Sequence, residues 1–208
     1  MAQQNHQESR QQDRTIEDRI RAIEDRLEIY NLIASHPPSA DTGADYYTRA
    51  VYVEDGELDL GRGKATAGNE TVAAVTTTPA HRAAIAGGLA HFAGLPRIEL
   101  DGDRAVVTSY LQILTPHPTA APHEVPNHGV SKGFRIHRVA ANRWELERSA
   151  GAWKIRRRTV RTIDGSEPPR EILRGALRSF ETRMTRQGVW IGPVIVAGIA
   201  RRRTSSAL

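Results

Sequence analysis

The sequence contains a carboxylate and an imidazole that could together move a proton. Asp41 lies in the run Asp41-Thr42-Gly43, and His91 lies in the mostly apolar run 89–92, Leu-Ala-His-Phe. A carboxylate bound to one ring nitrogen of an imidazole fixes its tautomer and raises the basicity of the other nitrogen. Taken alone, however, each residue favours a structural role: Asp41 as a turn residue before Gly43, and His91 as a core histidine with satisfied hydrogen bonds.

Several other kinds of site find no support in the sequence. It has no cysteine, which excludes disulfides, thiolate metal sites and a cysteine nucleophile. It also lacks the runs G-x-G-x-x-G and G-x-x-x-x-G-K-[ST], so nothing indicates a loop that cradles nucleotide phosphates.

The basic residues are nearly all arginine and are concentrated in the C-terminal part of the chain. Arginine supplies 26 of the 29 basic residues, and residues 133–208 hold 17 basic and 6 acidic side chains. Such an excess can mark a surface that binds nucleic acid or another anion. Acidic residues lie between the arginines, and we therefore interpret the pattern as a solvated face rich in arginine.

Four helices are predicted. Thr15 is a suitable N-cap, with Asp18 three residues later as a capping-box partner, and the prolines after His36 should end this helix near Ser35. Apolar residues then recur at helical spacing over residues 45–53, 69–76 and 167–184.

The remaining chain predicts a meander of strands over residues 57–60, 90–100, 105–114, 129–148 and 152–163. The turn Asp101-Gly102-Asp103 is a hairpin signal, residues 115–128 read as an irregular loop, and the strand from 129 reads as bulged or folded back near Asn142. Helices followed by a meander indicate an α+β fold. We expect a cone-shaped, curved, mainly antiparallel sheet wrapped around N-terminal helices, with a C-terminal helical extension and a small-molecule cavity.

The order of these landmarks resembles the nuclear-transport-factor-2-like superfamily. The landmarks are the first helix, Asp41-Thr42-Gly43, the second helix, and the runs 54–59 (Glu-Asp-Gly-Glu-Leu-Asp) and 151–155 (Gly-Ala-Trp-Lys-Ile). The nearest branch is the SnoaL-like group, which includes scytalone dehydratase, bile-acid 7α-dehydratase and hexachlorocyclohexane dehydrochlorinase. The resemblance covers about residues 15–165.

The resemblance implies a catalytic pair and several substrate-binding residues. Asp41 stands where these enzymes carry an aspartate that orients a histidine, and His91 stands where they carry the histidine that removes a proton from the substrate. By position or by chemistry, four further residues are candidates for substrate binding: His36, His117, Asn142 and Arg148.

The sequence also departs from these enzymes. Ala40 and Leu60 stand where scytalone dehydratase carries tyrosines, and His36 is the nearest counterpart of a tyrosine in the bile-acid enzyme. These differences argue against scytalone or a bile acid as the substrate.

The chain divides into three parts. Residues 1–14 are rich in Gln, Asn and Ser and are expected to be disordered. Residues 15–165 should form the cone-shaped domain, and residues 166–208 a helix followed by an apolar tail. The start of the chain lacks the apolar region of a secretory signal, so we expect a cytoplasmic protein.

The apolar tail, residues 189–200, is too short to span a bilayer and too apolar to lie in water. We expect it to cover the mouth of the cavity or to pack on another subunit, with Trp190 buried. The resemblance points the same way, because related enzymes form dimers or trimers. A homo-oligomer without stable membrane insertion is therefore expected.

Three functions follow as hypotheses. The first is a lyase or isomerase, of the dehydratase kind, that removes a proton from an apolar cyclic molecule (terpenoid, steroid, polyketide or aromatic) without a metal or an organic cofactor. The second is a non-catalytic protein of the same fold that binds a small molecule or serves as an accessory subunit. The third, a binder of nucleic acid or of anionic surfaces through the basic C-terminal part, is the least favoured, and we expect no nucleic-acid partner.

Overall fold

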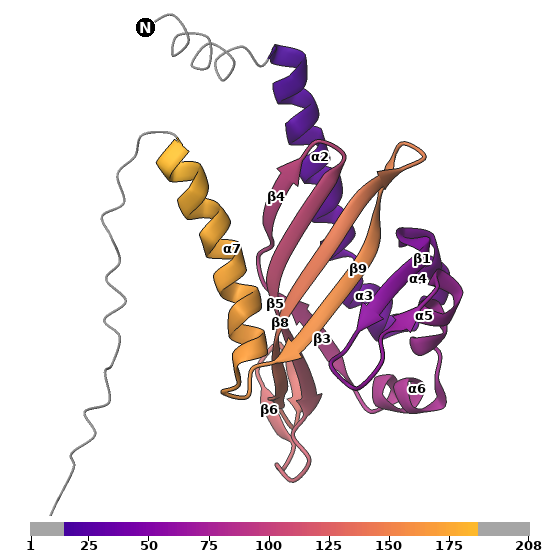
Figure 1. Ribbon diagram of the computed structural model, residues 1–208. Helices are drawn as coiled ribbons and strands as arrows, with labels where there is room; N and C mark the ends of the chain where they lie inside the picture. The colour runs from indigo at the N-terminus through magenta and orange to yellow at the C-terminus, as the bar shows by residue number, and fades with distance from the viewer. Residues whose placement is uncertain (1–14, 187–208) are drawn as a thin grey trace, which may run out of the picture.

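The computed structural model describes residues 15–186 of the chain (Figure 1). The expected disordered head and the apolar tail with Trp190 lie outside the described residues. The first described helix, α2 (Ile16–Ala34), starts with the predicted capping box: the Asp18 backbone N–H donates to Thr15 Oγ1 at 3.1 Å, and the Thr15 N–H donates to the Asp18 carboxylate. The helix ends at the predicted point, one residue before Ser35.

The segment after α2 is a further helix, α3 (His36–Thr42), where the sequence predicted only a turn. A proline ends the helix that precedes it, but its fixed φ fits the first turn of a new helix. Gly43 ends α3 with a left-handed φ of 66°, the conformation that glycine adopts at a helix end without steric cost. Asp41 therefore lies in the last turn of a helix.

Three more helices, α4 to α6, precede strand β3, and one helix, α7, follows the last strand. The segment α4 (Asp45–Val51) ends two residues earlier than predicted, and α5 (Asn69–Val75) agrees with the prediction. A helix that the sequence analysis missed, α6 (Pro79–Ala86), begins with Pro79 and is capped by the Thr78 hydroxyl, which accepts from the His81 N–H at 3.2 Å. The predicted C-terminal helix is α7 (Glu167–Arg186).

The strands follow the predicted meander with several differences. The observed strands are β1 (Tyr52–Asp59), β2 (Thr66–Ala67), β3 (Ala90–Ala93), β4 (Arg97–Asp101), β5 (Arg104–Pro116), β6 (His123–Val125), β7 (Gly129–Ser131), β8 (Phe134–Ser149) and β9 (Ala152–Thr162). Strand β1 begins five residues before the predicted strand 57–60, and the strands predicted over 90–100 and 129–148 are each two strands. The loop 115–128 contains β6, which pairs with β7. The strand β8 continues straight past Asn142 and does not fold back.

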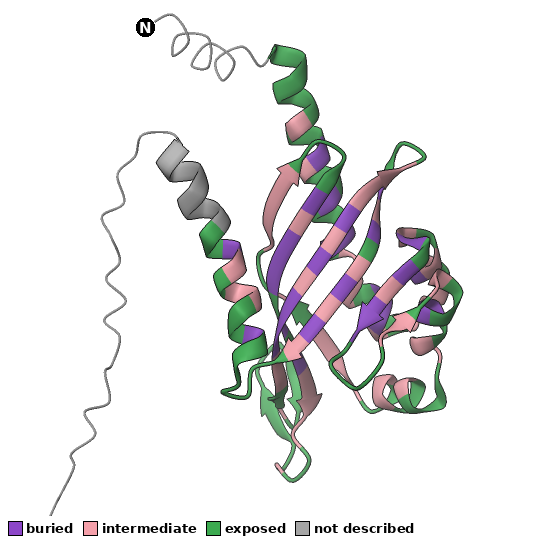
Figure 2. Ribbon diagram, in the orientation of Figure 1, coloured by how far each residue is buried: buried purple, intermediate pink, exposed green. Residues whose placement is uncertain are grey.

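The main sheet has the order β2-β1-β9-β8-β5-β3, with β4 also paired to β5. All its pairings are antiparallel except β1 with β9. This is the predicted α+β architecture with a curved, mainly antiparallel sheet. Along the strands, buried residues alternate with less buried ones (Figure 2), so the sheet has one inner face and one outer face.

The inner face packs against the N-terminal helices. Ile29, Leu32 and Ile33 of α2 join a core whose largest side chain, Trp144 of β8, is fully buried. On the outer face α7 lies beside β5, β8 and β9 (Figure 1). None of the helices in residues 15–186 is long and apolar enough to cross a membrane.

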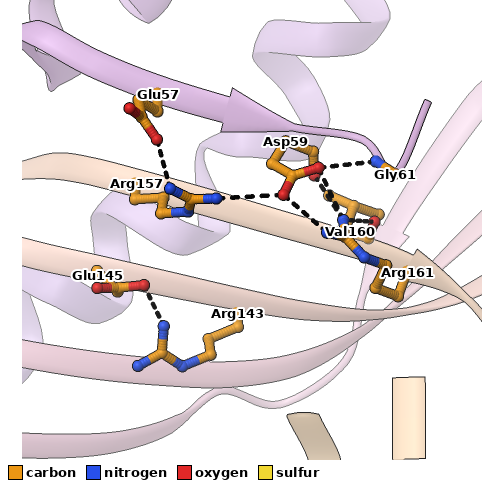
Figure 3. Close-up of polar contacts among 8 residues, drawn as sticks. All are labelled: Glu57, Asp59, Gly61, Arg143, Glu145, Arg157, Val160 and Arg161. Atoms are coloured by element: carbon orange, nitrogen blue, oxygen red, sulfur yellow. Dashed lines mark hydrogen bonds and ion pairs between the residues drawn. The ribbon is translucent and has the colours of Figure 1, made fainter. Parts of the chain in front are cut away.

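The outer face also explains much of the arginine in the sequence. Arg157 donates to Glu57 at 2.5 Å and to Asp59 at 3.3 Å, and Arg161 donates to the Asp59 carboxylate at 2.7 and 2.9 Å (Figure 3). Figure 3 also shows Arg143 paired with Glu145 on β8. These arginines are neutralised by acidic neighbours on the sheet, as the alternation of charges indicated.

Candidate functional site

A cavity of about 280 Å³ lies between the inner face of the sheet and the helices α2 to α6. Its lining is mainly apolar, from Leu32, Val51, Leu58, Val72, Val75, Leu89, Leu111, Ile113, Ile155 and Val160. Within this lining stand a few polar groups, among them His36, His81, His91 and Arg158. A mostly apolar cavity with a few convergent polar groups is the usual form of a small-molecule site.

The structure brings Asp41 and His91 into direct contact. One carboxylate oxygen of Asp41 lies 2.6 Å from His91 Nδ1, and the other accepts the His91 backbone N–H at 2.9 Å. The histidine is held at both its ring and its backbone, and its position relative to the last turn of α3 is therefore fixed. The α3·β3 contact that carries this pair is one of the main contacts between the helices and the sheet.

The contact also fixes which ring nitrogen can act. A carboxylate only accepts hydrogen bonds, so the proton of neutral His91 lies on Nδ1 and Nε2 carries the lone pair. Among the described residues no partner of Nε2 is found, and His91 lines the cavity. The ring can therefore accept a proton at Nε2 from a molecule in the cavity.

The surroundings keep this histidine neutral near pH 7. Burial lowers the pKa of His91 below 6.5, and the charge of Arg158 and the neighbouring His81 lower it further, while Asp41 raises it in part. A neutral imidazole is the form that a general base requires.

His36 stands next to His91 at the start of α3. Its ring contacts both His91 and Trp144 edge-on, with centroid separations of 6.3 and 5.2 Å. Its Nδ1 lies 3.3 Å from the Arg158 guanidinium, so Nδ1 accepts and the proton lies on Nε2. Burial lowers the pKa of His36 well below 6.5, with the Arg158 charge as the second cause, and His36 is a neutral polar group of the cavity.

Arg158 is the buried cation of the cavity. It is 6% exposed, donates from Nε to Asn142 Oδ1 at 3.1 Å, and lies over the Trp144 ring at 4.2 Å from its centroid. In the described part of the chain it forms no ion pair with a carboxylate; its other neighbours are His36 and Tyr52. Burial lowers the pKa of Arg158 to about 10 and raises that of Tyr52 to about 12, which leaves the arginine charged and the tyrosine neutral.

His81 connects helix α6 to the segment that carries Asp41. Its Nε2 donates to the Ala40 carbonyl at 2.7 Å, directly before Asp41 in the chain, and its ring lies 6.4 Å from that of His91. This bond holds the end of α3 against α6. The three histidines His36, His81 and His91 thus form one cluster in the lining of the cavity.

Two of the candidate substrate-binding residues lie away from the cavity. Arg148 forms ion pairs with Asp25 of α2 and with Asp103, and its guanidinium stacks on Trp153 at 4.8 Å. His117 follows β5, where its Nδ1 accepts the Ala120 N–H at 3.1 Å. Neither residue lines the cavity, so the structure does not bring them together with Asp41, His91 and His36.

Asn142 has an indirect place in the site. It is fully buried and does not line the cavity itself, but its Oδ1 holds Arg158. It is therefore a positioning residue for the buried cation. Its Nδ2 and the hydroxyl of Ser109 opposite it on β5 are buried without a partner in the described structure.

The sequence analysis missed Arg158 because a bulge changes the face of β9. Trp153 and Ile155 are buried, and strict alternation would next bury Arg157. The pairing of β9 with β8 slips between Ile155 and Arg157, and this turns Arg158 inward instead. An extra residue in one strand re-aims the side chains that follow it, and no residue type in this run of three arginines signals it.

Comparisons with known proteins agree with this architecture. The sequence profile of the SnoaL-like domain matches residues 21–159, and no curated protein matches the chain significantly. A nuclear-transport-factor-2-like protein with a cystatin-like fold from Novosphingobium aromaticivorans is 33% identical, with a TM-score of 0.66 over 76% of this chain and 97% of that chain.

More distant solved structures share the fold. A hexachlorocyclohexane dehydrochlorinase, LinA-type3, from Novosphingobium barchaimii LL02 is 15% identical, with a TM-score of 0.54 over 68% of this chain and 88% of its own. A candidate scytalone dehydratase from Novosphingobium aromaticivorans is 16% identical, with a TM-score of 0.51 over 68% and 85%. The profile match spans well over half of the sequence, and the chain therefore belongs to the SnoaL-like domain family of the nuclear-transport-factor-2-like fold.

Proposed function

We propose that the protein is a lyase or isomerase that removes a proton from an apolar cyclic molecule bound in the cavity. The observation that carries this proposal is the 2.6 Å contact between Asp41 and His91 Nδ1, which leaves Nε2 of a neutral imidazole facing an apolar cavity. The family supports it, because fold relatives include a protein named as a dehydrochlorinase and a candidate dehydratase.

The proposed step uses side chains only. His91 Nε2 takes the proton of a C–H bond next to a carbonyl or a leaving group, and Asp41 stabilises the imidazolium that forms. The electron pair of that C–H bond then either forms a C=C bond as the leaving group departs, or moves onto the carbonyl oxygen as an enolate. In the second case the proton returns to another carbon, and the product is an isomer.

Arg158 is proposed to stabilise the negative charge that develops on the oxygen or the leaving group. Its charge is buried, it is held by Asn142 and Trp144, and it has no carboxylate partner in the described structure. A preorganised cation in a cavity with little water is worth far more than the same cation in bulk solvent. His36, whose Nε2 carries the proton, is proposed as a neutral donor beside it.

Proton exchange with solvent tests the proposal without a known substrate. A panel of apolar cyclic ketones, alcohols and halides is incubated with the protein in D₂O, and deuterium uptake or loss of water or halide is followed by mass spectrometry. The His91→Gln variant should lose at least about 100-fold of the activity that is found, the usual scale for a positioned acid–base group.

The matched control is His117→Gln, a histidine outside the cavity lining, which should keep full activity. If the wild type exchanges no proton with any member of the panel yet binds several of them, the non-catalytic binding function replaces this proposal. If His91→Gln exchanges protons as fast as the wild type, His91 is not the base.

We propose in addition that the protein is a homo-oligomer, a trimer or a dimer. Four large apolar side chains are 49–57% exposed on the outer face of the sheet: Phe92, Tyr110, Phe134 and Ile136. Monomeric proteins seldom leave apolar side chains clustered on one sheet face.

A further inference from the structure

The charged side chains that line the cavity are all basic. Three arginines are among the lining residues, and no aspartate or glutamate is: Arg62, Arg138 and Arg158. The nearest acid to the histidine cluster, Asp41, is already bonded to His91. An apolar substrate alone gives no reason for two further arginines beside Arg158.

A β-bulge places Arg138 in the cavity. In the pairing of β5 with β8, Ile113 lies opposite Arg138 and Leu114 lies opposite Ile136, which leaves His137 as an extra residue. Both His137 and Arg138 consequently line the cavity. Bulges commonly re-aim side chains next to functional sites.

Arg138 is half-buried and lacks a partner for its charge. Its Nε is buried without a hydrogen bond, and burial together with the charge of Arg62 lowers its pKa. Among the side chains of residues 15–178, neither Arg62 nor Arg138 forms an ion pair. A partly buried cation without a partner is costly, and the nearby charge of Arg62 adds repulsion.

The arginines of the outer face differ in this respect. Arg143, Arg157 and Arg161 all have acidic partners (Figure 3). The chain thus has the acids to neutralise arginines on the same sheet, but in the described structure it places none of them beside Arg62 or Arg138. The unpaired arginines of the inner face are available to a ligand.

The strand register gives the approximate distance between Arg138 and the proposed base, His91. His91 of β3 lies opposite Ile113 of β5, and Ile113 lies opposite Arg138 of β8. These three residues form one row across the sheet, and all three line the cavity. Neighbouring strands are about 4.8 Å apart, so the backbones at His91 and Arg138 lie roughly 10 Å from each other.

We propose that the substrate is an apolar molecule that carries an anionic group, a carboxylate or a phosphate, and that Arg62 and Arg138 bind this group at the rim of the cavity. Arg62 is exposed and Arg138 half-buried, which places the anion near solvent. The apolar body then spans the row toward His91. Guanidinium groups bind both anions through paired hydrogen bonds. The inference rests on the proposed function only in taking the same cavity as the substrate site.

Matched pairs of charged and neutral probes test this inference by calorimetry. The pairs are 2-naphthoate with 2-naphthamide, and 2-naphthyl phosphate with 2-naphthol. The wild type should bind at least one anion about tenfold more tightly than its neutral partner, and the pair with the larger ratio identifies the preferred anion. Arg138→Gln and Arg62→Gln should each reduce the ratio several-fold and leave the affinity for the neutral probe unchanged.

Two controls separate this inference from the proposed function. Arg135→Gln, on the same strand but outside the cavity lining, should keep the ratio. His91→Gln should also keep the ratio of anion to neutral-probe affinity, because anion binding needs no proton transfer. The ratio therefore tests anion binding independently of the catalytic step. The inference is wrong if no anion binds more tightly than its neutral partner, or if the ratio survives in the Arg62→Gln/Arg138→Gln double variant. Because Arg62 lies on an exposed loop, its variant gives a readout even where Arg138→Gln fails to fold.

Discussion

At the scale of single residues, the proposed activity depends on the ionisation of His91. The pKa of His91 lies below 6.5, chiefly because of burial, whereas Asp41 raises it in part. The base acts only when neutral, so kcat/KM should rise with pH through an apparent pKa below 6.5 and reach a plateau above it. The measurement is the pH profile of whichever activity the exchange assay finds.

The Asp41→Asn variant should change both the height and the position of this profile. The loss of the carboxylate removes the group that raises the pKa of His91, so the apparent pKa should fall further. Asparagine can also donate to Nδ1, which would leave the proton on Nε2 and the wrong tautomer for a base, and we expect a loss of about 100-fold or more. Asp45→Asn, an acid on the next helix, is the control; an equal effect in both variants would show that Asp41 has only a general electrostatic role.

Four residues show how much of the site could be predicted from the sequence: Asp41, His91, Arg148 and Arg158. The resemblance selected Asp41 and His91 by their places in the order of landmarks, and the structure places the two side chains in contact. The chemistry of the side chains selected Arg148 for the cation, ten residues before Arg158, where the structure has the buried guanidinium. Both arginines lie on the inner face of the sheet, but Arg148 lies opposite Trp153 near the β8–β9 turn and pairs with Asp25, whereas Arg158 lies opposite Trp144 beside the cavity. The bulge that turns Arg158 inward is not encoded in the residue types.

At the scale of elements, the pairing of β1 with β9 depends on the Asp59 carboxylate. Hydrogen bonds from Arg161, with help from the Gly61 N–H and Arg157, lower its pKa to about 2 from 3.8. A carboxyl whose folded pKa is depressed stabilises the fold above its unfolded pKa, and this stabilisation is lost as pH falls from about 4 through 2.

The Asp59→Asn variant should therefore lower the free energy of unfolding at pH 7 by about 2 kcal/mol, the scale of charge-assisted hydrogen bonds. Urea unfolding at pH 7 and pH 3 measures it, and the difference from wild type should be smaller at pH 3. Asp55→Asn, whose carboxylate is 74% exposed, should change the free energy by less than about 0.5 kcal/mol. Equal losses at both pH values would mean that packing, not ionisation, is responsible.

A glycine holds the element that carries His91. Gly88, between α6 and β3, has a φ of +84°, and an added Cβ would lie 2.7 Å from Cγ of Pro116 at the end of β5. Gly151 has nearly the same φ, +83°, but open space around it. We expect Gly151→Ala to cost about 1 kcal/mol of unfolding free energy for the backbone alone, and Gly88→Ala about 3 kcal/mol, because a clash adds to it.

Urea denaturation compares these two variants directly. Equal destabilisation would show that Pro116 moves aside without cost.

The helices also show where prediction from sequence ends. Long helices and strands were found, but α3 and α6 carry prolines in their first turns that read equally well as turn residues. Their helical state is fixed by tertiary contacts such as the His81 bond to the Ala40 carbonyl, which local sequence does not reveal.

At the scale of the whole molecule, the two faces of the sheet have different tasks. The inner face holds the cavity, and the outer face is covered by α7 along part of β5, β8 and β9. The rest of the outer face exposes the apolar patch of Phe92, Tyr110, Phe134 and Ile136. Truncation after Met184 removes the apolar tail predicted from the sequence and leaves this patch, so it separates the contribution of the tail from that of the sheet face.

The last prediction concerns this patch. Light scattering on the eluting protein should give a mass of two or three times 23.0 kDa for the wild type. The Phe92→Ser/Ile136→Ser variant should give a smaller mass, because two apolar side chains more than half exposed on the sheet face become polar and burial of that face loses its driving force. Tyr46→Ser replaces an aromatic residue that is 71% exposed on α4 and should keep the wild-type mass. If the truncated chain alone loses the oligomer while the Phe92→Ser/Ile136→Ser variant keeps it, the subunits associate through the tail; a wild type with the mass of one chain would refute the oligomer altogether.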